Sequence, residues 1–323
     1  MIQKRQLGKT KLQISEIGLG CWPIGGFSSI NGIPITYGEL DESLSKKIIL
    51  TALEIGVNVF DTADVYSLGN SEKILGQSLK DFRSEIHLFT KGGFVPSTNL
   101  PRPFELDLSY NHLSASLDRS LKRLDTDYVD LFQAHSAPQS DKDFENLEKS
   151  FTNMKREGKA IYCGVSIGAD YEKGIQLIES GLVDSLQLYF SLINFESITK
   201  LFPIAKRYGV GLIIAEPLDQ GFLSGKYSVN HIFPKTDERS KYTKTEISKK
   251  IEFVNKFKIL TNKDHSLSQL ALSYILSKEE VSTCIPGAKS ILQLCSNCAS
   301  SSIHLTENEL VEIEKIQQTH SMI

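Results

Sequence analysis

Residues 128–166 read YVDLFQAHSAPQSDKDFENLEKSFTNMKREGKAIYCGVS, and this stretch indicates the fold. Its two ends, Tyr128–Gln133 and Ala160–Ser166, are apolar runs of the kind found in parallel strands that are buried on both faces. Between them, Asp141–Glu157 is amphipathic, with acidic residues in the first turn and basic residues in the last. A strand, a helix and a strand in this order predict a βαβ unit.

This alternation extends over the whole chain. Six further apolar runs are predicted as strands: Glu16–Gly20, Val57–Asp61, Ile86–Lys91, Ser185–Leu188, Gly211–Ala215 and Ser282–Ile285. The amphipathic stretches predicted as helices include Glu42–Ile55, Ser71–Lys80 and Asn111–Leu124. Eight strand-and-helix units over roughly 300 residues predict an α/β fold, a closed (β/α)8 TIM barrel, with residues 1–323 as one domain.

An open doubly wound sheet is the alternative architecture. Such a sheet usually carries the motif G-x-G-x-x-G after its first strand. Here residues 18–23 read GLGCWP, and Pro23 does not allow a clean helix start of that kind. Residues 3–14 predict a two-stranded β-hairpin around Gly8 and Lys9, which we expect to cap the barrel floor.

Three predicted connections are long: Pro23–Glu39, Gly92–Asp107 and Pro217–Tyr242. All three follow the C-terminal end of a strand, where the active sites of barrel enzymes lie. Long loops in a compact domain are usually functional. We therefore expect the three loops to surround the functional site, and the last of them, which contains Gly221 and Gly225, to be a mobile lid.

Composition and charge exclude several classes of protein. The 36 Lys and Arg residues against 39 Asp and Glu give a net charge of −3, which argues against a nucleic-acid partner. No apolar run approaches the length of about 18 residues that a membrane span needs. The first 15 residues, MIQKRQLGKTKLQIS, lack the apolar core of a signal peptide. We expect a cytoplasmic protein with no membrane partner.

The five cysteines do not predict a disulfide framework, because the count is odd and the expected compartment is reducing. Cys295 and Cys298 form a C-x-x-C pair near the C-terminus. A zinc site would need two more ligands close in space. The pair is interpreted as two small apolar residues one helical turn apart.

Polar residues at the ends of the apolar strands are the strongest functional signal. Asp61 ends one strand, Lys91 ends the next, and His135 follows the one after; Tyr66 lies five residues beyond Asp61. In a barrel these neighbouring strand ends converge on one mouth. The sequence therefore predicts that an Asp, a Tyr, a Lys and a His share a pocket.

These four residue types suit the reduction of a carbonyl group. A Tyr with a pKa near ~10 is a poor acid, and an ammonium at hydrogen-bond distance is expected to lower that pKa. A carboxylate would hold the ammonium, and an imidazole would orient the carbonyl oxygen. Tyr66 would then donate a proton while hydride reaches the carbonyl carbon. The alternative is a structural Asp61–Lys91 ion pair with Tyr66 and His135 merely packed beside it.

The sequence resembles the aldo-keto reductase family, and the resemblance spans nearly the whole chain in the expected order. The segments that carry it are Gly56–Tyr66, Gly69–Gly76, Thr90–Lys91, Gln133–His135, Gly164–Ser166, Gln187, Pro217–Tyr227 and Ile285–Ser290. The resemblance implies a (β/α)8 barrel that reduces carbonyl compounds with NADPH. It also implies that Asp61, Tyr66, Lys91 and His135 are the catalytic tetrad.

The resemblance further implies where NADP(H) would bind. Near the nicotinamide it places Gly20, Cys21, Trp22, Ser166 and Gln187. At the diphosphate it places Pro217, Leu218 and Gly221, with Lys226 close by. At the adenosine end it places Gly287, Lys289, Ser290, Gln293 and Asn297, and Lys289 with Ser290 at a helix start would select the 2′-phosphate of NADPH.

Several positions depart from the family pattern. Ile167 replaces an Asn, Ala215 replaces a Tyr or Arg, and Gln293 replaces an Arg that some members have. Glu216 and Asp219 add two carboxylates beside the expected diphosphate, which they would repel unless they point away from it or are neutralised by Lys226. None of these departures removes a catalytic group.

The leading function is therefore the reduction of an aldehyde or ketone, with a sugar or sugar derivative among the possible substrates. Trp22, Phe27, Phe94 and Phe190 are expected to shape the substrate site together with the three loops. The alternative is a binding or regulatory subunit similar to the β subunits of potassium channels. A zinc-dependent barrel hydrolase would need several strand-end ligands, and only His135 is an obvious one. The sequence leaves the substrate and the oligomeric state open.

Overall fold

The structure, a computed structural model, describes residues 2–99, 101–261 and 265–319. A sheet of eight strands forms its centre, and all pairings within it are parallel. In chain order the strands are β3 (Leu19–Gly20), β6 (Val59–Asp61), β7 (His87–Gly92), β10 (Val129–Ala134), β11 (Ala160–Gly168), β12 (Ser185–Tyr189), β13 (Gly211–Ala215) and β14 (Val281–Cys284).

The sheet closes on itself between its first and last strands. Parallel bridges join Ile17 to Cys284 and Gly20 to Gly287. The backbone N–H of Gly18 donates to the carbonyl of Cys284 at 2.8 Å. A Cβ atom on Gly20 would lie 2.4 Å from the carbonyl oxygen of Ile285, so only glycine fits this seam. The predicted barrel is confirmed, and all eight predicted strands are present with ends shifted by a few residues.

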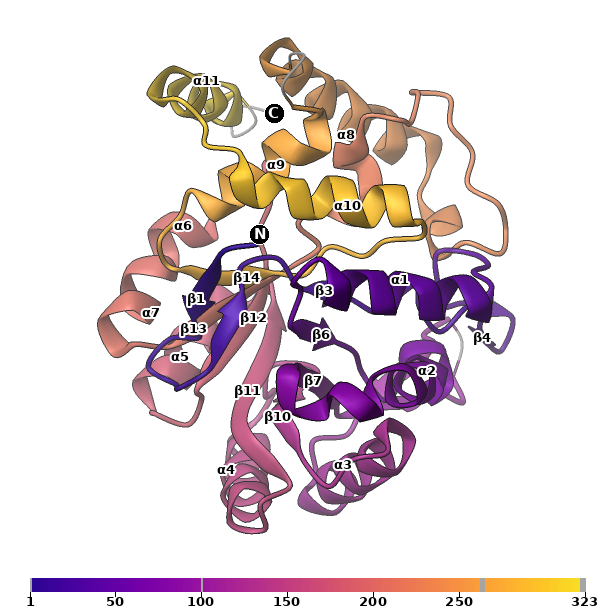
Figure 1. Ribbon diagram of the computed structural model, residues 1–323, viewed down its shortest axis with the longest axis vertical. Helices are drawn as coiled ribbons and strands as arrows, with labels where there is room; N and C mark the ends of the chain where they lie inside the picture. The colour runs from indigo at the N-terminus through magenta and orange to yellow at the C-terminus, as the bar shows by residue number, and fades with distance from the viewer. Residues whose placement is uncertain (1, 100, 262–264, 320–323) are drawn as a thin grey trace.

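Helices surround the barrel, as Figure 1 shows. They are α1 (Glu42–Glu54), α2 (Asn70–Leu79), α3 (Tyr110–Leu124), α4 (Asp141–Arg156), α5 (Tyr171–Glu179), α6 (Ser197–Lys200), α7 (Phe202–Tyr208), α8 (Lys244–Lys256), α9 (Leu267–Leu276), α10 (Ile291–Ala299) and α11 (Glu307–Gln318). Side-chain caps start most of them. For example, Ser140 accepts a hydrogen bond from the N–H of Asp143 at the start of α4, and Thr243 forms a capping box with Glu246 at the start of α8.

The N-terminal hairpin closes one end of the barrel. Its strands are β1 (Lys4–Gln6) and β2 (Gln13–Ser15), which pair antiparallel. Leu7, Leu12 and Ile14 form one apolar cluster with side chains from inside the barrel, among them Phe89 and Ile213. The hairpin lies at the strands' N-terminal ends, because the N–H of Lys9 donates to the carbonyl of Gly209, two residues before β13. The predicted cap on the barrel floor is therefore present.

The loops at the opposite end contain local structure of their own. The first holds a small hairpin of β4 (Ser29–Ile30) and β5 (Ile33–Pro34). The second holds a hairpin of β8 (Phe94–Pro96) and β9 (Phe104–Leu106). The third holds two 3₁₀ turns, η3 (Asp219–Ser224) and η4 (Glu238–Lys241).

Candidate active site

Three neighbouring strands bring the predicted catalytic side chains together. Asp61 is the last residue of β6, Lys91 lies near the end of β7, and His135 directly follows β10. The three strands are adjacent and parallel, so their C-terminal ends meet at the same edge of the barrel. Tyr66 begins the 3₁₀ turn η1 (Tyr66–Gly69) just beyond β6.

The Lys91 ammonium is the centre of this cluster. It is fully buried and forms an ion pair with Asp61 Oδ1. Its Nζ also donates to the carbonyl of Thr62 at 2.8 Å and to the hydroxyl of Tyr66 at 3.2 Å. Each of the three N–H bonds of the Lys91 ammonium therefore has an acceptor, and this fixes the ammonium beside the Tyr66 phenol.

Two glutamines hold the other oxygen of the Asp61 carboxylate. Gln187 Nε2 donates to Oδ2 at 2.8 Å, and Gln133 Nε2 donates to the same atom at 3.2 Å. Gln133 is a contact that sequence reasoning missed. Gln133 lies two residues before His135, and alternate residues of a strand point to the same face. This spacing could have indicated that Gln133 faces the site. The buried carboxylate therefore has partners on both oxygens.

The Tyr66 pKa differs from the sequence expectation. Burial raises the pKa of Tyr66, the Lys91 ammonium lowers it, and Asp61 raises it again, so that the net shift is upward from 10.0. Lys91 lowers the Tyr66 pKa as expected, but the expected net lowering is wrong, because desolvation of the phenolate is the larger effect. Burial disfavours the Lys91 ammonium, but Asp61 and Tyr66 outweigh burial and raise its pKa. Tyr66 is therefore a protonated donor beside a permanent cation.

His135 lies on the other side of Tyr66, with the two ring centroids 5.6 Å apart. Burial and the Lys91 ammonium hold the pKa of His135 well below 6.5. The imidazole is therefore neutral at pH 7. Within the described residues its Nδ1 atom is buried with no hydrogen-bond partner.

Aromatic side chains extend the cluster. The ring of Trp22 packs edge-on against Tyr66 at 4.7 Å between centroids, and Phe94 lies 5.0 Å from His135. Phe27, which is also expected to shape the substrate site, is 45% exposed. The expectation for Phe190 is wrong, because its side chain is fully buried and packs against Phe202 of α7 and Tyr274 of α9.

The residues expected near a nicotinamide occupy three parts of the barrel mouth. Gly20 ends β3, the buried Cys21 follows it, and Trp22 comes next. Ser166 of β11 and Gln187 of β12 are paired in register. The indole Nε1 of Trp22 is buried without a hydrogen-bond partner in the part of the chain that the structure describes.

The residues expected at the adenosine end gather at the start of α10. Ser290 caps this helix by accepting from the N–H of Gln293 at 3.2 Å, and the side chain of Gln293 accepts from the N–H of Lys289 at 2.8 Å. Asn297 Nδ2 donates to the carbonyl of Gly287 at 3.4 Å. The Lys289 ammonium crosses to the first loop and donates to the carbonyl of Tyr37 at 2.7 Å.

The turn after β13 contains Pro217, Leu218 and Gly221 and has unusual backbone geometry. Glu216, Asp219 and Gln220 have φ values of 50°, 45° and 54°, in the left-handed region. Asp219 forms an ion pair with Lys250 of α8 at 2.7 Å. Lys226, which was expected to neutralise the two carboxylates, is exposed and lies over the Tyr227 ring at 5.0 Å. Lys250 takes that role for Asp219.

Arg239 holds the third loop together, and no periodic pattern in the sequence indicates this role. Its guanidinium forms a bidentate contact with Asp237 at 2.8 and 2.7 Å. It also donates to the carbonyl of Gln220 at 2.6 Å and to the hydroxyl of Tyr227 at 2.8 Å. An isolated antiparallel bridge joins Asp237 to Tyr37 of the first loop. The first and third loops are therefore connected across the barrel mouth.

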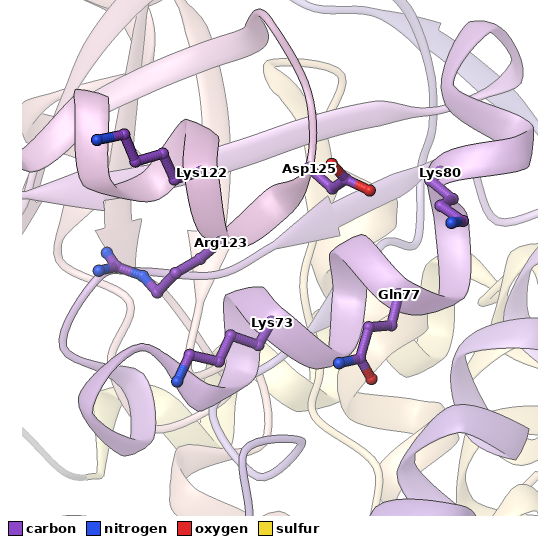
Figure 2. Close-up of a pocket in the computed structure, with 6 residues that line it drawn as sticks. All are labelled: Lys73, Gln77, Lys80, Lys122, Arg123 and Asp125. Carbon is purple, nitrogen blue, oxygen red and sulfur yellow. The ribbon is translucent and has the colours of Figure 1, made fainter.

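A pocket of about 400 Å³ lies elsewhere, on the outer surface between α2 and α3 (Figure 2). It is lined by Lys73, Gln77, Lys80, Lys122, Arg123 and Asp125. None of these residues lies at a barrel strand's C-terminal end, so the pocket is not part of the tetrad site. Arg123 connects the pocket to the buried Glu72, whose carboxylate also accepts from Thr90 beside Lys91.

No group of three or more His, Cys, Asp or Glu side chains in the described residues is arranged to hold a metal ion. No helix in the same residues is long and apolar enough to cross a membrane.

Comparisons with known proteins identify the family. Residues 16–318 match the model of the "Aldo/keto reductase family". The chain is 32% identical to a putative voltage-gated potassium channel subunit beta of Schizosaccharomyces pombe, over 91% of this chain and 86% of that protein. It is 28% identical to an NADH-specific methylglyoxal reductase of Escherichia coli, with 95% of each chain covered. A solved aldo-keto reductase from Bacillus halodurans, in its holo form, superposes with a TM-score of 0.79 at 29% identity, covering 98% of this chain and 96% of that one. The chain therefore belongs to the aldo/keto reductase family of oxidoreductases.

Proposed function

We propose that the protein is an NADPH-dependent oxidoreductase that reduces an aldehyde or ketone to the alcohol. The observation that supports this most is the hydrogen-bonded series Asp61–Lys91–Tyr66 with a neutral His135 beside it. A structural ion pair alone would not need a phenol and an imidazole at the same strand ends.

The four side chains would divide the work as follows. The Tyr66 hydroxyl donates its proton to the substrate's carbonyl oxygen as negative charge develops there. The Lys91 ammonium, 3.2 Å from that hydroxyl, stabilises the phenolate that remains. Asp61 holds the ammonium in place. The neutral His135 imidazole carries one N–H, which can orient the same carbonyl oxygen.

When bound, the dinucleotide supplies the hydride that reduces the carbonyl carbon. We propose that Gly20, Cys21, Trp22, Ser166 and Gln187 hold its nicotinamide. Two observations fit a polar ligand at this position. The Trp22 Nε1 and His135 Nδ1 atoms are buried and lack partners in the described residues. A buried polar atom without a partner is costly unless a ligand satisfies it.

We propose that the rest of the dinucleotide lies across the turn after β13 and the start of α10. Pro217, Leu218, Gly221 and Lys226 would face the diphosphate. Gly287, Lys289, Ser290, Gln293 and Asn297 would face the adenosine. The start of α10, a helix N-terminus with its positive dipole end, suits a phosphate.

Selection of NADPH over NADH would rest on Lys289. Its ammonium is near the capped start of α10, although it now donates to the carbonyl of Tyr37. A 2′-phosphate would offer it a stronger, charged acceptor. The Escherichia coli relative is named NADH-specific, so members of the family differ in this choice and the comparison must be made by experiment.

We propose a small carbonyl compound as the substrate, because Trp22 and Phe94 leave an aromatic lining beside Tyr66 and His135. We also propose that the protein works in the cytoplasm. All five of its cysteines are free, which suits a reducing compartment.

The test is a steady-state assay of NADPH and NADH oxidation with a panel of aldehydes, ketones and sugars. We expect turnover with at least one aldehyde or ketone and a lower KM for NADPH than for NADH. Turnover with NADH alone would overturn the cofactor assignment. No turnover with any compound, under conditions where the dinucleotide binds, would overturn the enzymatic assignment.

A binding subunit is the second candidate function. The similarity to the putative channel subunit of Schizosaccharomyces pombe favours it, at 32% identity. The assay above separates the two candidates, because a protein that acts only by binding would take up the dinucleotide and turn over none of the carbonyl compounds.

A further inference from the structure

We propose that Glu216 takes up a proton when the dinucleotide binds, so that cofactor affinity depends on pH through a carboxyl group outside the tetrad. The proposal rests on the proposed function, because it assumes that the diphosphate lies beside the turn that begins at Pro217. It concerns the cofactor's binding equilibrium and not the chemical step.

Glu216 is a carboxyl group without a cation. Both of its oxygens accept from Gln220 Nε2, at 3.2 and 3.3 Å. No Lys or Arg in the described residues forms an ion pair with it, whereas Asp219, three residues on, is paired with Lys250 at 2.7 Å. Nothing in this turn therefore offsets a negative charge on Glu216 directly.

The surrounding groups add further negative potential. Six titratable side chains interact electrostatically with Glu216, and they come from the elements packed around it. They are Tyr37 of the first loop, Tyr189 of β12, Asp219 of η3, Glu238 of η4, Tyr242 after η4, and Lys250 of α8. Two of these are carboxylates and one is a cation. Burial, and then the Asp219 carboxylate, raise the pKa of Glu216 to about 7.

Contacts within the turn also hold the Glu216 side chain in a fixed position. Glu216 and Gln220 both have positive φ, so the turn adopts a conformation that contacts must maintain. Gln220 receives a hydrogen bond from Tyr242 at 2.9 Å through its side chain and one from Arg239 at 2.6 Å through its carbonyl. Because the carboxylate is fixed, an arriving anion is accommodated by protonation more readily than by movement.

The coupling between protonation of Glu216 and cofactor binding gives the direction in which the Kd changes with pH. With a pKa of about 7, the Glu216 carboxyl of the free protein is mostly protonated below that pH and mostly ionised above it. An anionic diphosphate nearby raises the pKa further, so that the complex keeps the proton to a higher pH. Between the two pKa values, binding takes up close to one proton and the Kd rises about tenfold per pH unit. Below pH 6 the Kd no longer responds to this group.

The experiment is isothermal titration of NADH into the full-length protein at pH 8, in two buffers with different ionisation enthalpies. NADH is the probe because it lacks the 2′-phosphate, whose own titration near pH ~6 would add to the signal. The difference in heat between the buffers counts the protons taken up. We expect about 0.5–1 proton for the wild-type protein and none for Glu216→Gln.

Two further measurements separate Glu216 from its surroundings. At pH 8 Glu216→Gln should bind NADH up to about tenfold more tightly than the wild type, with a Kd that stays constant from pH 6 to 8. Glu252→Gln is the matched control, since Glu252 is an exposed carboxylate of α8 that accepts from Ser248 at 2.8 Å and the variant leaves Glu216 and its neighbours in place. Proton uptake should persist in this control.

Binding of NADH by the wild type without proton uptake would overturn the proposal and leave the proposed function intact. Uptake that persists in Glu216→Gln, or that is lost equally in Glu252→Gln, would also overturn it. Absence of binding by NADH and NADPH alike would overturn the proposed function, and this inference with it.

Discussion

The two halves of the barrel mouth are built in different ways. On one side, Asp61, Lys91 and His135 sit on or next to three adjacent strands, and their positions follow from the backbone of the sheet. On the other side, the groups around the turn after β13 are held by side chains that connect loops. Lys289 reaches Tyr37 across 252 residues of sequence, and Arg239 reaches back to Gln220.

This difference decides how each half would respond to change. The strand-held half is buried, and its hydrogen bonds join residues that the fold already fixes. The loop-held half depends on individual side chains whose loss leaves the strands intact. We therefore expect substitutions in the first half to alter chemistry, and substitutions in the second half to alter binding and mobility.

The largest effect is expected for Tyr66→Phe in the strand-held half. The change removes one hydroxyl and its contact with Lys91, and little packing. Carbonyl reduction should fall by about 10²-fold or more, the usual loss when a general acid is removed. The Kd for NADPH should stay nearly constant. The measurement is kcat together with a fluorescence titration of NADPH.

The matched control is Tyr208→Phe, on the outer helix α7, where the ring is 39% exposed. It should leave kcat unchanged. A Tyr66→Phe protein that turns over at the wild-type rate would falsify the proton-donor assignment and remove the functional basis of the comparison.

Lys289→Ala is expected to give the next largest effect, in the loop-held half. A well-placed charged contact is worth roughly 1.5–3 kcal/mol, or about 10- to 150-fold in affinity. The Kd for NADPH should rise within that range, and the Kd for NADH should hardly change. Fluorescence quenching with both cofactors measures this. Lys226→Ala, which removes an exposed ammonium, should cost less; equal losses for NADH and NADPH in Lys289→Ala would contradict the assignment.

A smaller effect is expected when the connection between the loops is weakened. Arg239→Lys keeps the positive charge but loses the bidentate contact with Asp237. It also keeps a cleavage site for trypsin, so that limited trypsin digestion can be compared between wild type and variant. If the lost contact costs about 1–2 kcal/mol, cleavage within Lys235–Lys241 should become roughly 5- to 30-fold faster. NADPH should slow the cleavage in both proteins if the loop closes on the cofactor. Rates that are the same in wild type and variant would show that Arg239 does not hold the loop.

The smallest effect concerns pH. Burial and Lys91 keep the pKa of His135 well below 6.5, so the imidazole stays neutral through the physiological range. At saturating NADPH and substrate, kcat should therefore show no histidine step between pH 6 and 8, because protonation of the ring begins only at lower pH. A clear fall in kcat as the pH drops through 6.5 would place the imidazole in a more solvated setting than the structure gives.

The parts of the molecule that the sequence predicts well are those set by periodicity. The eight strands follow from apolar runs, and the meeting of Asp61, Tyr66, Lys91 and His135 follows from polar residues at or just beyond the ends of these runs. The floor hairpin follows from the turn at Gly8 and Lys9. The catalytic and cofactor roles of these residues stay predictions. What periodicity cannot supply is the balance of competing forces at one atom. The direction of the Tyr66 pKa shift was missed because desolvation outweighs a cation that the sequence could place.

Loop contacts were missed for a related reason. Phe190 follows a strand end and was expected at the mouth, but its ring turns outward into the layer of α7 and α9. Lys250 belongs to a later helix, and no spacing rule brings it to Asp219. Arg239 and Tyr37 meet through two loops that are far apart in the chain. Each of these contacts depends on how separate segments come together in three dimensions.

The floor hairpin also constrains the order in which the chain can fold during synthesis. Arg5 donates to the backbone carbonyls of Leu276, Lys278 and Val281, and Ile17 bridges to Cys284. At about 5–20 residues per second, a ribosome needs roughly 15–50 s to make the chain between those two bridge partners. Throughout that interval the apolar side chains of the hairpin lack their final neighbours. The first residues to be made are thus among the last to reach native contacts, and barrel closure is a late, non-local step.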